Sequence, residues 1–298
     1  MSEFLSELST AMAGVVESAG RSVVRVEGRR RLAASGIIWS DDGVIVTAHH
    51  VVQHDGEIGV GLPGGELMAA RLVGRDPVTD LAVLRVEARG LRAATSAPDE
   101  DLRVGHLVLA LGRPGRTVQA THGIISALGE SWRTPAGGQV ERYLQTDVVM
   151  YPGFSGGPLA DVEGRVIGLN TSALLRGVSL ALPAPTLTRV VETLLTHGRM
   201  RRGYLGVTAQ PVRLPQATAQ HLDQETGLLL AAVNAGSPAE AAGLALGDTL
   251  VALGGQPLRH MDDLVALLGA EHIDQGVSVR YLRGGQLQEA TVVVGARP

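Results

Sequence analysis

The stretch Gly153-Phe154-Ser155-Gly156-Gly157-Pro158 is the most distinctive local feature of this 298-residue chain. It sets a serine between glycines, and glycine permits the unusual backbone angles that a sharp turn needs. Such a turn suits a nucleophilic hydroxyl, and it can aim the backbone N–H groups of Gly153 and Ser155 at one point, as an oxyanion hole does. An ordinary glycine-rich loop is the plainer interpretation, because the chain contains 39 Gly. A nucleophile is therefore predicted only if a base and a carboxylate accompany the serine.

Both partners have candidates upstream of that serine. His50 ends a strand-like run at 44–50 and precedes the small apolar pair at 51–52. Asp80 stands at the mouth of another apolar run. The order along the chain is His, Asp, Ser, and the first two lie in one half of a β-rich region while Ser155 lies in the other. A cleft between two β-barrels would bring the three together.

Short β-like runs fill the region from Ser22 to about Ala184, and many are bounded by Gly, Pro, Asp or Asn, as strand ends usually are. The clearest are Ser22–Glu27, Ser35–Trp39, Gly43–Thr47, Glu57–Leu62, Leu81–Val86, Leu107–Leu111, Gly123–Ala127 and Val166–Asn170. Repeated short strands with little helix between them indicate a barrel or a sandwich. The spacing of apolar residues predicts helices near the N-terminus and over Pro185–His197, the second ending at Gly198.

Composition excludes several kinds of chemistry. All 26 basic residues are Arg, so Schiff-base lysines, Ser-Lys dyads and P-loop lysines are ruled out. Without Cys there is no thiol nucleophile and no cysteine-ligated metal. The net charge of −4 argues against nucleic acid as a partner. The longest apolar runs, such as Leu228–Val233, fall short of the ~18 residues of a membrane span.

The N-terminal residues Met1–Phe4 lack the basic and apolar regions of a signal peptide. A cytoplasmic location is expected for the sequence as written. A periplasmic or other extracytoplasmic location is expected if a targeting segment once preceded it.

Taken together, the motifs resemble the HtrA/Deg family of chymotrypsin-fold serine proteases with a C-terminal PDZ domain. The matching segments, in order over nearly the whole chain, are Ser22–Val26, Thr47–Val52, Asp76–Leu84, Gly123–Gly129, Gln145–Asp147, Gly153–Leu159 and Val166–Thr171. The resemblance implies a mainly β fold, with a chymotrypsin-like double six-stranded β-barrel and then an α+β PDZ domain. We expect an N-terminal amphipathic helical segment at 1–20, the protease domain at 21–198 and the PDZ domain at 199–298.

The same resemblance implies roles for individual residues. His50, Asp80 and Ser155 would form the catalytic triad, and Gly153 and Ser155 the oxyanion hole. His49 competes with His50, but the family pattern puts the base directly before the small apolar pair. Met150 and Leu180 would help to line the substrate pocket, which predicts cleavage after small or medium apolar residues. That both are plain core residues is an equally weighted interpretation. Neither a cofactor nor a metal is predicted.

The implied activity is ATP-independent cleavage of unfolded polypeptides by a homotrimer, with the N-terminal segment near the trimer contact. Phe154 and Tyr151 depart from the family pattern beside the nucleophile. They motivate the alternative of a proteolytically inactive or latent peptide-binding protein, a holdase chaperone with the same fold.

The second domain resembles the family's peptide-binding module. Tyr204-Leu205-Gly206-Val207 matches its carboxylate-binding loop, where backbone N–H groups would receive a peptide C-terminus. Arg201 or Arg202 would add charge attraction. A helix over 261–268 would wall the groove with leucines, which implies apolar C-terminal residues as ligands. A second helix is predicted after Ser237-Pro238, with the serine as its N-cap.

Overall fold

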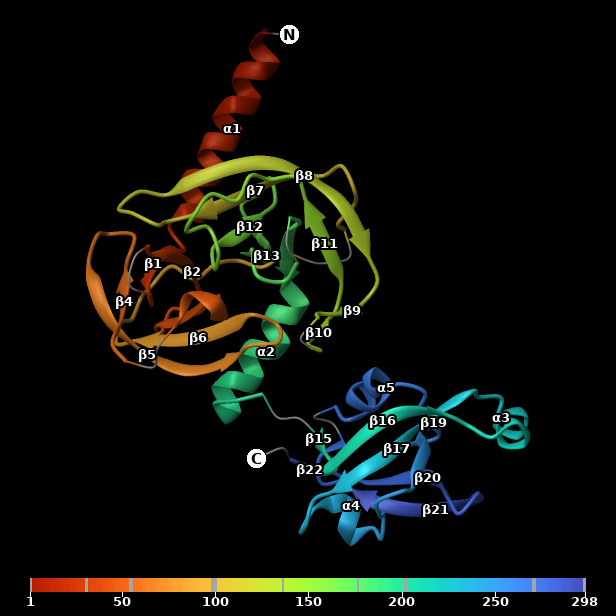
Figure 1. Ribbon diagram of the computed structural model, residues 1–298. Coiled ribbons are helices and arrows are strands. Elements are labelled where there is room, and N and C mark those ends of the chain that lie inside the picture. Colours follow the sequence, from red (N-terminus) through yellow and green to blue (C-terminus); the bar gives the residue numbers. More distant parts are fainter. Residues whose placement is uncertain are drawn as a thin grey trace. The chain divides into compact units, whose positions relative to one another are not determined.

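The computed structural model, drawn in Figure 1, describes residues 2–29, 32–53, 56–97, 101–135, 137–175, 177–200, 203–269 and 272–296. Its chain divides into two compact units, Met1–Met200 and Arg201–Pro298. Among the described residues, no helix is long and apolar enough to cross a membrane.

The first unit contains two closed six-stranded barrels. Around the first barrel the strands follow the order β1 (Val23–Glu27), β2 (Ala34–Ile38), β3 (Val44–Ala48), β6 (Leu81–Val86), β5 (Leu67–Asp76) and β4 (Ile58–Gly61). Strands β2 and β3 are buried along their whole length. Valine and isoleucine dominate β3 and line the interior, and β-branched side chains pack well on a pleated surface.

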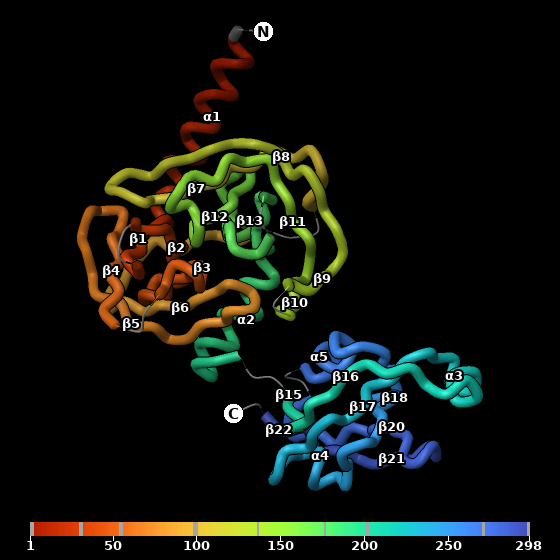
Figure 2. The backbone as a smooth tube through the Cα atoms, in the orientation of Figure 1, coloured from red at the N-terminus to blue at the C-terminus, as the bar shows by residue number. Residues whose placement is uncertain are grey.

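Around the second barrel the strands follow the order β11 (Tyr143–Thr146), β14 (Ser179–Pro183), β13 (Val166–Thr171), β12 (Pro158–Ala160), β7 (Leu107–Gly112) and β8 (Gln119–Gly129). A small hairpin of β9 (Trp132–Arg133) and β10 (Gln139–Val140) leads into it. Figure 2 shows the two barrels side by side. The paired strands within each barrel are antiparallel. The predicted mainly β, double-barrel fold is confirmed.

Two α-helices belong to this unit. The inner end of α1 (Ser2–Gly20) packs Val15, Val16 and Ala19 against the second barrel, whereas Phe4 and Leu5 near its outer end are exposed. Figure 1 shows α1 projecting away from the barrels. Helix α2 (Ala184–His197) buries one apolar face and ends at Gly198, whose φ of 70° is left-handed, as predicted for its stop.

The second unit is an α+β domain. Its main sheet has the order β16 (Val207–Arg213), β17 (Thr226–Val233), β18 (Thr249–Leu253), β20 (Gly276–Arg283) and β21 (Gln286–Val293), with β19 (Gln256–Pro257) beside β18. The remaining elements are the pair β15 (Gly203–Tyr204) and β22 (Gly295–Ala296) and the helices α3 (Gln216–Leu222), α4 (Pro238–Ala241) and α5 (Met261–Leu267). Ser237 caps α4 by accepting a hydrogen bond from the Glu240 N–H at 3.2 Å, as predicted.

Candidate active site

His50 and Asp80 meet because β3 and β6 are antiparallel neighbours in the first barrel. Ala48 pairs with Leu81 at the end of both strands, so the residues just outside the ladder face each other. The 3₁₀ turn η1 (His49–Val51) then directs His50 toward Asp80. His50 Nδ1 lies 2.8 Å from Asp80 Oδ2, and the His50 backbone N–H donates to Asp80 Oδ1 at 2.8 Å.

Asp80 is held in place from both barrels. Its φ of 59° lies in the left-handed region, which is uncommon for a residue other than glycine, and its side chain is buried. The Thr171 hydroxyl, at the end of β13 in the second barrel, donates to Asp80 Oδ2. The carboxylate therefore keeps one orientation toward the imidazole. Sequence reasoning did not single out Thr171.

His49 stands apart from this pair. Its backbone N–H donates to the Asp80 carbonyl at 2.9 Å, while its Nδ1 is buried without a hydrogen-bond partner in the described part of the chain. Burial lowers the pKa of His49, with the nearby Asp80 charge opposing that shift. His49 lacks the ring contact to a carboxylate that His50 has, which agrees with the choice of His50 as the candidate base.

Ser155 follows a tight turn. The Phe154 N–H donates to the Tyr151 carbonyl at 3.0 Å, with Pro152 and Gly153 between them. Gly153 has φ of 95°, so the turn is type II, whose central positions favour proline and then glycine. Gly156 has φ of 86°, and a Cβ there would lie 2.2 Å from the Ser35 carbonyl oxygen. Both positions around Ser155 therefore favour glycine, because of their positive φ angles and, at Gly156, because a side chain would clash.

Strand β2 fastens this loop through Ser35. The Ser35 N–H donates to the Ser155 carbonyl at 3.1 Å, and the Ser35 hydroxyl donates to the Gly153 carbonyl at 2.7 Å. In contrast, the N–H groups of Gly153 and Ser155 donate to no acceptor within the described residues. Two backbone donors beside one serine are what an oxyanion hole needs.

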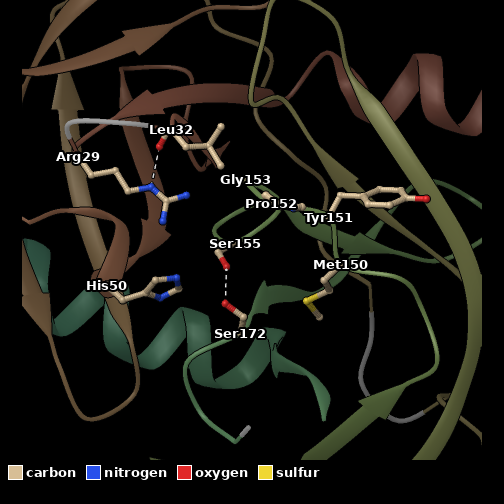
Figure 3. A pocket seen from close by; sticks show the side chains of 9 residues that line it. All are labelled: Arg29, Leu32, His50, Met150, Tyr151, Pro152, Gly153, Ser155 and Ser172. Atoms are coloured by element: carbon tan, nitrogen blue, oxygen red, sulfur yellow. Dashed lines mark hydrogen bonds between the residues drawn. The ribbon is translucent and has the colours of Figure 1, made fainter. Parts of the chain in front are cut away.

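His50, Gly153 and Ser155 line one pocket, shown in Figure 3. The complete set of described lining residues is Arg29, Leu32, His50, Met150, Tyr151, Pro152, Gly153, Ser155 and Ser172. The Ser155 hydroxyl is hydrogen-bonded to the Ser172 hydroxyl at 3.2 Å, and no hydrogen bond joins it to His50. Catalytic hydrogen bonds are often long without substrate and tighten when it binds.

Only one of the two predicted pocket residues lines this pocket. Met150 lines the pocket, whereas Leu180 in β14 is buried in the apolar core and is not among the residues that line it. Phe154 points into the second barrel, where it is fully buried and meets Tyr151 edge to face at 5.8 Å between ring centroids. The aromatic residue beside the nucleophile therefore anchors the turn and leaves the pocket clear.

The predicted carboxylate loop of the second unit is a sharp turn between β15 and β16. Gly206 has φ of 79°, and its carbonyl accepts from the Asn234 N–H at 2.8 Å. The N–H groups of Leu205 and Gly206 have no acceptor in the part of the chain that the structure describes. Helix α5 contributes Leu264 to the core beneath. Arg201 and Arg202 lie outside the described residues.

Among the described residues, no group of three or more His, Cys, Asp or Glu is placed to hold a metal ion.

Two domain families match the chain. Residues 34–169 match the trypsin-like peptidase domain, and residues 203–294 match the PDZ domain. Both matches fall within the units described above. The first match includes all three candidate catalytic residues, His50, Asp80 and Ser155.

Curated relatives are named "probable periplasmic serine endoprotease DegP-like". The one from Marinomonas sp. is 37% identical over 285 residues, covering 94% of this chain and 60% of the relative. The one from Halomonas elongata is 39% identical over 275 residues, covering 90% of this chain and 57% of the relative. The chain thus spans less than two thirds of the length of these relatives.

Solved structures match over nearly their whole length. The HtrA-type protease AlgW with a tripeptide is 32% identical with a TM-score of 0.74, and the alignment covers 96% of this chain and 97% of that one. The serine endoprotease from Yersinia pestis is 30% identical with a TM-score of 0.76, covering 95% and 97%. This chain therefore belongs to the HtrA family of trypsin-like serine proteases with a PDZ domain.

Proposed function

We propose that the chain is an ATP-independent serine endopeptidase that cleaves unfolded or exposed polypeptides. One observation carries the proposal: His50 Nδ1 lies 2.8 Å from the buried Asp80 carboxylate, and His50 also lines one pocket with Ser155. This is the arrangement of base, orienting carboxylate and nucleophile that acyl transfer to serine requires. The names of the relatives support the same activity.

In the proposed reaction, the Ser155 hydroxyl first leaves Ser172 and turns to His50. Its oxygen attacks the scissile carbonyl while the imidazole accepts its proton, and Asp80 stabilises the imidazolium. The N–H groups of Gly153 and Ser155 would bind the oxyanion of the tetrahedral intermediate. The imidazolium then gives its proton to the leaving amine. Water hydrolyses the acyl-enzyme by the same steps in reverse, with His50 as base.

The second unit is proposed to bind the C-termini of peptides. The unpaired N–H groups of Leu205 and Gly206 support this role, because a terminal carboxylate needs backbone donors at a turn. A bound peptide would extend the sheet at β16, with its apolar side chains toward α5. Domain limits of 21–198 for the protease and 199–298 for the PDZ domain remain our proposal.

The latent, holdase-type alternative is not favoured. Of the two residues that motivated it, Phe154 is buried in the second barrel, and Tyr151 lines the pocket with an exposed side chain. Assembly as a homotrimer through the protease domain remains a proposal, for which the exposed Phe4 and Leu5 of α1 offer an apolar surface. An extracytoplasmic location is likewise proposed, because the curated relatives are named periplasmic. A cytoplasmic location has no support from them.

The test is cleavage of a permanently unfolded model protein by the full chain. Ser155→Ala and His50→Ala should each lower the rate by at least about four orders of magnitude, the typical cost of losing a triad member. Ser22→Ala is the matched control, since that buried hydroxyl donates to Ala19 at 2.8 Å, away from the pocket. An active-site phosphonate should label Ser155 alone. Undiminished cleavage by Ser155→Ala would refute the assignment.

A further inference from the structure

Arg29 gives the active-site pocket a charge that the catalytic mechanism does not use. Among the described residues that line the pocket, Arg29 carries the only permanent charge, and none is a carboxylate. Resting on the function proposed above, we infer that Arg29 selects substrates with Asp or Glu at the first or second position after the scissile bond.

The Arg29 side chain is held in place at one nitrogen and is free at the other two. Its Nε–H donates to the Leu32 carbonyl at 2.6 Å, which directs the guanidinium into the pocket from the segment between β1 and β2. The two terminal amino groups have no hydrogen bond or ion pair in the described part of the chain. They are a pair of parallel donors of the kind that binds a carboxylate through both of its oxygens.

Neighbouring acidic groups leave the Arg29 charge uncompensated. Glu27, on the same segment, is paired with Arg25 at 2.6 Å. Asp80 is buried behind His50 and bound by the ring and by Thr171. A carboxylate arriving with the substrate would meet a cation that has no other partner among the described residues.

The geometry places Arg29 on the leaving-group side of the nucleophile. Figure 3 shows Met150 and Arg29 on opposite sides of Ser155, with Arg29 on the His50 side. The leaving amine must receive its proton from His50. The residues that follow the scissile bond therefore extend from His50 away from Met150, toward Arg29 and Leu32. Arg29 would therefore recognise acidic residues in the half of the substrate that leaves with the new amino terminus.

Two series of peptides test the inference with the full chain. Each series shares one sequence up to the scissile bond and carries Glu, Gln or Lys at the first or the second following position. In at least one series, kcat/KM for the Glu peptide should exceed that for the Gln peptide by about three- to tenfold, the range of a charge-assisted hydrogen bond that stays partly in water. The preference should shrink as salt is raised, because salt screens exposed charges.

Variants of Arg29 test whether this residue causes the preference for the Glu peptide. Arg29→Gln should abolish the Glu-to-Gln preference, and Arg29→Glu should favour the Lys peptide. Arg21→Gln removes one exposed positive charge at the end of α1 and should keep the preference. Mass spectrometry must show cleavage at the same bond throughout.

Equal kcat/KM for the Glu and Gln peptides in both series, or an unchanged preference in Arg29→Gln, would overturn the inference and leave the proposed function intact. Cleavage of none of the peptides would instead refute the proposed function, and the inference with it.

Discussion

At the scale of single residues, the hydroxyl of Ser155, the candidate nucleophile, has two hydrogen-bonding side chains beside it in the pocket. The Ser155 hydroxyl is bonded to Ser172 at 3.2 Å, although His50 lines the same pocket. Where Ser155 is the donor in this bond, the bond must break before His50 can accept the proton. A neutral hydrogen bond contributes about 1 kcal/mol net, so this competition is worth up to about fivefold in rate.

Ser172→Ala is therefore expected to raise the acylation rate up to about fivefold, because it removes the competing partner without opening a cavity. Burst kinetics with an activated ester would measure acylation separately from deacylation. Ser179→Ala is a suitable control, since that hydroxyl donates to Val148 at 3.1 Å and lies outside the pocket lining. A fall in the acylation rate of Ser172→Ala would show instead that Ser172 positions the nucleophile.

Ser35 is the residue whose removal should loosen the oxyanion hole. Its fully buried hydroxyl donates to the Gly153 carbonyl and accepts from the Arg113 N–H, each at 2.7 Å. Ser35→Ala should lower kcat about tenfold or more with little change in KM, because a donor displaced from the oxyanion costs transition-state binding.

Ser22→Ala provides the matched comparison for Ser35→Ala, since each variant removes one buried hydroxyl. Ser22 lies just before β1, and Ser35 lies in β2. Thermal unfolding should shift by similar amounts in the two variants, and only Ser35→Ala should lose kcat. An equal loss of kcat in both would assign the effect to general destabilisation.

Local motifs in the sequence predicted the three candidate catalytic residues, but not the residues that hold them in place. His50, Asp80 and Ser155 were predicted from local motifs, and the fold brings His50 and Asp80 into contact. Thr171 and Ser35 were missed as supports of the site because they act across 91 and 118 residues of chain. A threonine or serine inside an apolar strand carries no local sign of which distant carbonyl or carboxylate it will meet.

At the scale of elements, strands with a continuous apolar run were predicted well. The run Leu81–Val86 coincides with β6, and Val166–Asn170 lies within β13. Strand β5 (Leu67–Asp76) was not predicted, because its alanines, arginines and exposed positions break the period-two pattern. Hydrogen-bonded pairing with both β4 and β6 stabilises this segment as a strand, although its local sequence shows no strand pattern.

Arg113 is expected to fasten α1 and β1 to the second barrel. Its buried guanidinium donates to the carbonyls of Gly20, Val23 and Arg116 at 2.7 to 2.9 Å. Burial lowers the pKa of Arg113, and the three carbonyls, one of them at the negative end of α1, favour its charged form. Arg113→Gln should lower the free energy of unfolding by about 2 to 3 kcal/mol, since it leaves buried acceptors unpaired.

The local consequence of Arg113→Gln is faster hydrogen exchange at the inner end of α1 and in β1, measured by mass spectrometry on the full chain. Arg21→Gln, which removes an exposed arginine next to the same helix end, should leave both unfolding and exchange nearly unchanged. Uniform destabilisation in Arg113→Gln, with no preferential exchange at 15–27, would contradict the anchoring role.

At the scale of the whole molecule, each unit has its own apolar core. The clusters of the first unit contain described residues only up to Met200, and those of the second begin at Leu205. The family resemblance predicted two domains, but only the distribution of cores gives a physical reason to expect that each folds without the other. The fragments 1–200 and 199–298 should therefore be folded separately, with cooperative unfolding by circular dichroism. Loss of cooperative unfolding in either fragment would contradict this.

Separate folding allows the peptide-binding role to be measured in the 199–298 fragment alone. By calorimetry, it should bind a peptide with an apolar C-terminal residue, and amidation of the peptide's C-terminus should weaken binding at least about tenfold, because the carboxylate is lost. Gly206→Ala should abolish binding, since φ is 79° and a Cβ would lie 2.2 Å from Ser237 Cβ. Gly236→Ala is the matched control: φ is 69°, but no atom lies within 4 Å of its Cβ, so binding should survive a loss of about 1 kcal/mol in stability. Equal binding of the free and amidated peptides would show that the Leu205–Gly206 turn does not recognise the carboxylate.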